Sequence, residues 1–132
     1  MRYRKRDLIH PKLSYLINGL LFKAHNSLGR FRNEKQYADA LEELLKENGI
    51  RYQREVPLPK SFKGEKARRN IPDFLIDNKI ILDIKAKRLI TKEDYYQVRR
   101  YLVSYKKKLG IIINFRQRSL APKRVLNTDL QT

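Results

Sequence analysis

Hydrophobic residues recur at helical spacing in two successive segments near the start of the chain. From Pro11 to Leu28 they fall at intervals of three and four residues: Leu13, Leu16, Ile17, Leu20, Leu21 and Ala24. Gly29 is a typical stop signal for this first helix. Asn33 can cap a second helix that ends at Asn48 and Gly49, with an apolar stripe of Tyr37, Ala40, Leu41, Leu44 and Leu45. We therefore expect two helices before any strand.

The pattern then changes to short apolar runs. Ile50, Tyr52 and Val56 predict a strand that stops at Pro57, and the polar, basic stretch 60–70 predicts a loop. Next come two apolar runs, 74–76 and 80–84, with Asp77 and Asn78 between them. Such a pair of runs indicates an antiparallel hairpin with a tight turn.

A third helix is predicted to begin at Thr91, which forms a capping box with Asp94. The candidates for its buried side are Tyr95, Val98, Tyr101, Leu102 and Tyr105. Gly110 then precedes three isoleucines, a run typical of a strand buried on both faces, and a short last strand is predicted over 124–126. The strand, helix, strand order favours a right-handed crossover with a parallel pair. The predicted fold is α/β, a small mixed sheet of about four or five strands flanked by helices.

Composition bounds the organisation and the partners. A length of 132 residues predicts one domain over 1–132, with a basic N-terminal segment over 1–10. The net charge of +17 exceeds what solubility needs and implies a polyanion, with nucleic acid first and an anionic membrane surface as the alternative. No stretch is apolar enough to span a membrane, and polar residues interrupt any signal-peptide core, so we expect a cytoplasmic protein.

Two acidic residues and a lysine carry the chemistry. Asp83 and Lys85 are two apart on one predicted strand, so they share a face while Ile84 points to the opposite layer. Asp73 lies on the partner strand and can join them. A divalent cation between two carboxylates removes their repulsion, and a chain without cysteine and with two histidines favours oxygen ligands, hence Mg²⁺ or Mn²⁺. The alternative is that an Asp-x-Lys triplet is a solvated strand face.

These residues carry a resemblance to a known family. Pro72-Asp73 followed by Asp83-Ile84-Lys85 resembles the PD-(D/E)XK nuclease signature. Further similarity to the bacterial GxxExxY branch of that superfamily lies in Leu28-Gly29, Glu34-Lys35-Gln36-Tyr37, Ala40-Leu41, Pro57-Leu58-Pro59 and Gly110 through Asn114-Phe115. The glycine that opens the branch's motif is replaced by Phe31 in this chain.

The resemblance implies a restriction-endonuclease-like core with its site at the hairpin, beside the second helix. It implies that Glu34 joins Asp73, Asp83 and the backbone carbonyl of Ile84 as metal ligands. It also implies a catalytic role for Gln97, with Tyr101 one helical turn later. The alternatives are that Glu34 is only a first-turn residue that the helix dipole favours and that Tyr101 is a core aromatic. His25 is interpreted as a partly buried, hydrogen-bonded histidine.

Basic residues are predicted to grip the substrate. The candidates are Lys63, Lys66, Arg68, Arg69, Arg99 and Arg100. The alternative is that these residues form a solvated face that keeps the protein soluble. The leading hypothesis is metal-dependent hydrolysis of phosphodiester bonds in DNA, with DNA favoured over RNA and a homodimer possible for cutting two strands. Two alternatives stay open: a nucleic-acid-binding module with a silent nuclease site, and a basic interaction protein that uses the fold as a scaffold.

Overall fold

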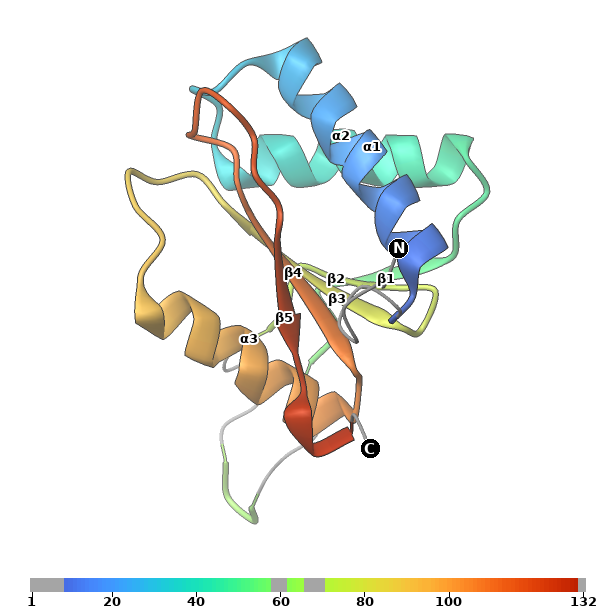
Figure 1. The fold of residues 1–132 in the computed structure, drawn as a ribbon, viewed down its shortest axis with the longest axis vertical. Coiled ribbons are helices and arrows are strands. Elements are labelled where there is room, and N and C mark those ends of the chain that lie inside the picture. Colours follow the sequence, from blue (N-terminus) through green and yellow to red (C-terminus); the bar gives the residue numbers. More distant parts are fainter. Residues whose placement is uncertain (1–8, 58–61, 66–70, 131–132) are drawn as a thin grey trace, which may run out of the picture.

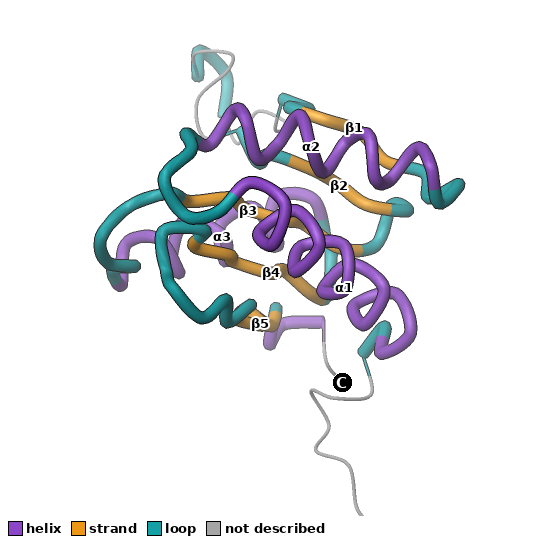
Figure 2. Tube along the Cα trace, turned by 90° about the horizontal axis from the view of Figure 1, so that it is seen from above, coloured by secondary structure: helices purple, strands orange, loops and turns teal. Residues whose placement is uncertain are grey.

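The computed structural model describes residues 9–57, 62–65 and 71–130. Three helices and five strands follow one another along the chain: α1 (Pro11–Leu28), α2 (Glu34–Glu47), β1 (Tyr52–Arg54), β2 (Phe74–Ile76), β3 (Ile80–Lys85), α3 (Lys92–Tyr105), β4 (Leu109–Asn114) and β5 (Lys123–Leu126). The strands form one sheet in the order β1-β2-β3-β4-β5 (Figure 2). The predicted antiparallel hairpin of β2 and β3 and the predicted parallel pairing of β3 with β4 are both confirmed.

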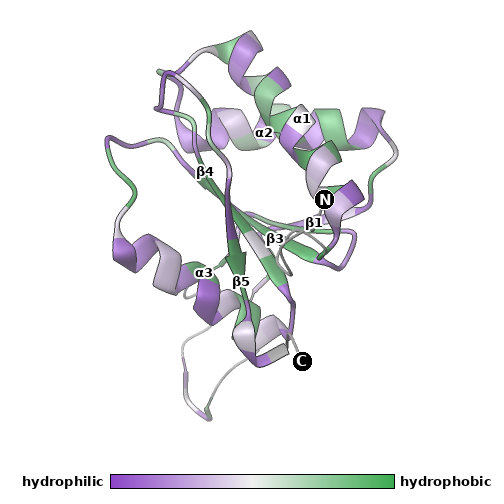
Figure 3. Cartoon of the chain, viewed as in Figure 1, coloured by the Kyte–Doolittle hydropathy of each residue, from purple (hydrophilic) through white to green (hydrophobic). Residues whose placement is uncertain are grey.

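The sheet separates two helical layers. α1 and α2 cover one face and α3 covers the other (Figure 1). Alternate strand residues supply the two cores, because side chains point to opposite faces with period two. Phe74, Leu82 and Ile84 pack toward α1 and α2, whereas Leu75 and Ile81 pack toward α3. The hydropathy colouring shows hydrophobic central strands between helices that carry both hydrophilic and hydrophobic residues (Figure 3).

The hairpin turn and the helix starts follow local sequence signals. Asp77 and Asn78 have φ angles of 50° and 54°, a left-handed conformation that Asp and Asn tolerate, at the centre of a turn closed by a hydrogen bond of 3.0 Å from the Lys79 N–H to the Ile76 carbonyl. Both predicted caps form, with Asn33 accepting from the backbone N–H of Gln36 and Thr91 pairing with Asp94. The register of the hairpin is therefore set next to its turn.

Two details differ from the expected pattern. The first strand ends at Arg54 rather than Val56, because Glu55 adopts a φ of 55° that interrupts the extended backbone. On α1, Leu16 is 54% exposed and Leu13 is only partly buried, whereas Ser14 is buried together with the remaining predicted positions Ile17, Leu20, Leu21 and Ala24. Of the stretch predicted as a loop, residues 60, 61 and 66–70 lie outside the described part of the chain.

Gly110 lets α3 approach the sheet closely. A Cβ at this position would lie 2.6 Å from Cγ1 of Val98, which is nearer than such atoms approach one another. Within the described ranges, none of the helices is long and apolar enough to cross a membrane.

Candidate active site

Asp73, Asp83 and Lys85 lie on the face of the sheet that α3 covers. Asp83 and Lys85 have the strand parity of Ile81, which packs against α3, and Asp73 precedes β2 with the parity of Leu75. Ile84 points into the opposite core, as predicted. The site therefore lies on the face that α3 covers, on a strand that also contacts α2.

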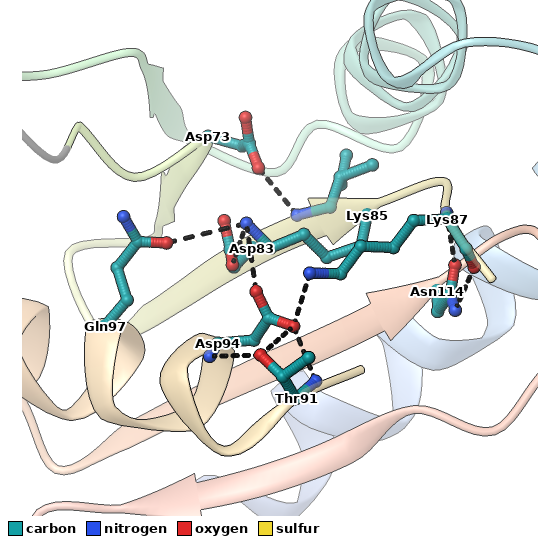
Figure 4. Close-up of polar contacts among 9 residues, drawn as sticks. Asp73, Asp83, Lys85, Lys87, Thr91, Asp94, Gln97 and Asn114 are labelled. Carbon is teal, nitrogen blue, oxygen red and sulfur yellow. Dashed lines mark hydrogen bonds and ion pairs between the residues drawn. The ribbon is translucent and has the colours of Figure 1, made fainter. Parts of the chain in front are cut away.

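Short contacts link these side chains to one another and to α3 (Figure 4). Asp73 Oδ2 accepts a hydrogen bond of 2.6 Å from the backbone N–H of Ile84. Lys85 Nζ lies 3.2 Å from Asp83 Oδ2 and donates to Gln97 Oε1 at 3.5 Å. Four of the five predicted catalytic residues are thus brought together from a hairpin and one helix.

The two aspartates are held together at an electrostatic cost. Burial and the neighbouring Asp83 carboxylate raise the pKa of Asp73 to about 8, although the Ile84 N–H opposes this rise. Burial also raises the pKa of Asp83, against the opposing effect of Lys85. Tyr101 is buried close by, and burial together with both aspartates raises its pKa. Tyr101 is thus a core aromatic next to the acidic pair.

Lys85 is held as an ammonium ion. Burial disfavours its charge, but Asp83, Glu34 and Asp94 outweigh that effect and raise its pKa. A lysine with a raised pKa is suited to stabilise negative charge rather than to accept a proton.

A second lysine, Lys87, stands next to Lys85 and was not anticipated from the sequence. Its Nζ lies 2.6 Å from Asp94 Oδ2, and the other oxygen of Asp94 lies 4.0 Å from Lys85 Nζ. Burial opposes the charge of Asp94, yet hydrogen bonds from Lys87 and Thr91 lower its pKa. The carboxylate that caps α3 therefore also holds the lysines. The signal in the sequence was the period-two row of Asp83, Lys85 and Lys87.

Asn114 fixes the backbone of Lys87 from the neighbouring strand. Its side chain accepts from the Lys87 N–H at 3.1 Å and donates to the Lys87 carbonyl at 2.7 Å. The Asn114 side chain is buried, so this clamp is shielded from water. The chain directly after β3 is thereby held in place, although the backbone pairing of β3 with β4 ends at Lys85.

Glu34 approaches the site from the other helical layer. It is exposed at the first position of α2, and burial together with Asp83 raises its pKa while Lys85 lowers it. Glu34 is therefore within electrostatic range of the hairpin residues. In the described part of the chain, no three His, Cys, Asp or Glu side chains are close enough to hold a metal ion by themselves.

The predicted nucleic-acid contacts are placed only in part. Arg99 and Arg100 are exposed on α3, the helix that also carries Gln97, and Lys63 is exposed in the short described segment 62–65. Lys66, Arg68 and Arg69 lie outside the described residues. His25 is partly buried, and its Nε2 lies 2.9 Å from the carbonyl of Gln117, as expected for a structural histidine.

The donor set fits a hard divalent cation. Asp83 Oδ2 is buried and accepts no hydrogen bond from the described residues, although Lys85 lies beside it as an ion-pair partner. A buried carboxylate oxygen without a hydrogen bond, next to a second carboxylate, is the environment that a cation with oxygen ligands stabilises. The residues present therefore suit a divalent cation that prefers oxygen ligands better than a metal that prefers sulfur or imidazole.

A mixed α/β sheet whose acidic hairpin carries a lysine defines a nuclease-like domain, and comparison with known proteins identifies its family. The family model described as the PD-(D/E)XK nuclease superfamily matches residues 11–125. The chain therefore belongs to the PD-(D/E)XK nuclease superfamily. No curated protein sequence matches it.

One solved structure supports the fold. The crystal structure of a protein called SSO0001 is similar with a TM-score of 0.52 and 18% sequence identity, covering 86% of this chain and 76% of the other. This likeness concerns the fold. Membership of the superfamily indicates a nuclease, that is, a hydrolase acting on nucleic acid, and nucleases of this superfamily generally depend on a divalent metal. The GxxExxY branch remains a prediction.

Proposed function

We propose that this protein is a Mg²⁺- or Mn²⁺-dependent deoxyribonuclease that acts in the cytoplasm. The observation that supports this best is the buried acidic pair of Asp73 and Asp83 on one face of the sheet, with Lys85 Nζ 3.2 Å from Asp83 Oδ2. An acidic pair at this position is costly without a cation, and a stability role alone gives no reason to keep it.

In this proposal the metal is held by Asp73, Asp83 and the backbone carbonyl of Ile84, with Glu34 as the ligand from α2. When bound, the ion supplies Lewis acidity and offsets charge that builds on the phosphate. Glu34 approaches this set from the N-terminus of α2, and its pKa already responds to the charges of Lys85 and Asp83.

The remaining residues act on the scissile phosphate. In phosphodiester hydrolysis a water oxygen attacks phosphorus, the opposite P–O ester bond breaks, and negative charge on the phosphoryl oxygens increases in the transition state. Lys85, held as an ammonium ion by Asp83, stabilises that charge. Gln97 accepts from Lys85 and so directs the ammonium toward the substrate. Arg99 and Arg100, further along α3, bind phosphates of the same strand.

The test measures cleavage and binding separately. Linear, circular, single-stranded and branched DNA, with matching RNA, are incubated in Mg²⁺, Mn²⁺ or EDTA, and binding is measured in Ca²⁺. Lys85→Ala is expected to lower turnover at saturating DNA by about 10²- to 10³-fold, as for loss of a transition-state donor, while affinity changes little.

The matched control is Lys79→Ala, because Lys79 lies in the turn at the far end of the same hairpin and pairs with Asp77. This variant is expected to cleave like the parent. A parent that cleaves no DNA or RNA in either metal, yet still binds DNA, would support the silent binding module instead.

A further inference from the structure

The loop between α1 and α2 is fixed to the core at several points. Tyr37 Oη donates to the carbonyl of Gly29 at 2.5 Å and accepts from the backbone N–H of Arg32 at 3.2 Å. Tyr37 itself is buried and stacks on Phe115, with ring centroids 4.1 Å apart and planes 4° apart. The backbone on both sides of Phe31 is therefore anchored.

Two arginines brace the same loop against the segment that follows β4. Arg30 Nε donates to the carbonyl of Arg116 at 2.9 Å, and Arg116 Nε donates to the carbonyl of Arg30 at 3.1 Å. Arg116 also donates to the carbonyl of Ala86 at 3.3 Å. Because Ala86 directly follows Lys85, this brace ties the loop to the catalytic strand.

Phe31 is presented to solvent by this rigid loop. Its side chain is 75% exposed, and the guanidinium carbons of Arg30 and Arg116 lie 5.0 Å and 5.8 Å from its ring centroid. The ring contributes nothing to either core cluster. A large apolar side chain held outside the core by an ordered backbone indicates a contact surface.

The surface around the ring is cationic and adjoins the site. A depression of about 520 Å³ is lined by Phe31, Arg32, Asn33, Glu34, Lys35, Ala86 and Arg116. The three cations of this lining outnumber its one carboxylate, Glu34. An aromatic ring with an excess of arginine and lysine around it matches a polyanion that carries flat rings, because bases stack on aromatic side chains while cations hold the phosphates. An apolar protein partner would leave these cations buried without counter-charges.

We propose that Phe31 stacks on an unpaired base of the nucleic-acid strand next to the scissile phosphate. Arg32 and Lys35, the exposed cations that line the depression, bind the phosphates that flank this base. The inference rests on the proposed function for the position of the scissile phosphate, and it names the substrate class: strands with an unpaired base at the cleavage point, such as single strands, frayed ends and junctions.

The experiment uses DNA oligonucleotides that carry the fluorescent base 2-aminopurine, either in a single-stranded overhang or within a blunt duplex, in EDTA. The parent is expected to change the emission of the overhang base on binding. Phe31→Ala is expected to abolish this change and weaken overhang binding roughly tenfold, the fold-change given by about 1.4 kcal/mol of stacking. Blunt-duplex affinity is expected to remain within about twofold.

Two further variants separate stacking from apolar bulk. Phe31→Leu keeps the bulk without the π face and is expected to behave like Phe31→Ala, whereas Phe31→Trp is expected to restore the emission change. Phe22→Ala is the matched control, because Phe22 is an exposed phenylalanine on α1 outside the depression. Equal losses for overhang and duplex, or full binding by Phe31→Leu, overturn the proposal.

The outcome is independent of catalysis. If the emission change depends on Phe31 but the parent cleaves nothing in Mg²⁺ or Mn²⁺, base stacking on Phe31 is supported and the nuclease function is refuted. If the parent cleaves DNA but Phe31→Ala binds overhangs like the parent, base stacking on Phe31 is refuted and the nuclease function is supported.

Discussion

Asp73→Asn is expected to stabilise the protein in the absence of metal and to abolish stabilisation by metal. Burial beside Asp83 raises the pKa of Asp73 from 3.8 to about 8, so the folded protein binds a proton that the unfolded chain releases between these values. Because the folded state then holds more protons, its free energy of unfolding falls as pH rises from about 4 to 8. Asparagine does not ionise, so the Asp73→Asn variant does not lose stability in this way as pH rises.

The magnitude follows from the difference in pKa. At about 1.36 kcal/mol for each pKa unit, the rise corresponds to at most about 6 kcal/mol. Lys85 beside Asp83 and local hydration offset part of this cost, so we expect Asp73→Asn to exceed the parent by about 2–3 kcal/mol at pH 8. Near pH 4 the protonated aspartate and asparagine are nearly equivalent, and the two proteins are expected to agree within about 0.5 kcal/mol.

The assay is urea unfolding followed by circular dichroism in EDTA at pH 4, 6 and 8. Asp129→Asn serves as the control, because Asp129 is an exposed carboxylate in the short 3-10 helix after β5. Saturating Mn²⁺, at about 100 times its Kd, is expected to add about 2.7 kcal/mol to the parent and almost nothing to Asp73→Asn. The same difference between parent and variant at pH 4 and pH 8 would refute the reasoning.

Three other predictions concern the helix that covers the site. Gly110→Ala is expected to destabilise the protein by about 1–3 kcal/mol, because the new Cβ would meet Val98 at 2.6 Å, and urea unfolding that matches the parent would contradict this contact. Replacing Arg99 and Arg100 together by alanine is expected to reduce the slope of log K against log salt by about two, measured by fluorescence anisotropy, and an unchanged slope would remove both from the interface. Asp94→Asn removes the counter-charge of Lys87 and weakens the cap of α3, so a stability loss of about 1 kcal/mol is expected by thermal unfolding, with an unchanged melting temperature as the contrary result.

The elements of this fold could be predicted from the sequence because their signals are local. The helical spacing before Gly29, the capping box of Thr91 and Asp94, and the turn at Asp77 and Asn78 each depend on residues a few positions apart. The period of two also placed Asp83 and Lys85 on one face of their strand. These signals determined the α/β architecture and the residues from which a site could form.

Only the tertiary structure decided how those parts meet. Packing between elements decides that α3 covers the face with Asp83. The same packing decides that Glu34 approaches Lys85 from the opposite helical layer. The clamp of Asn114 on Lys87 joins residues 27 positions apart. The exposure of Phe31 depends on braces from Arg116, 86 positions away from Arg30. Such contacts leave no periodic trace in the sequence, because they depend on where the folded chain brings distant backbone groups and not on the neighbours of each residue.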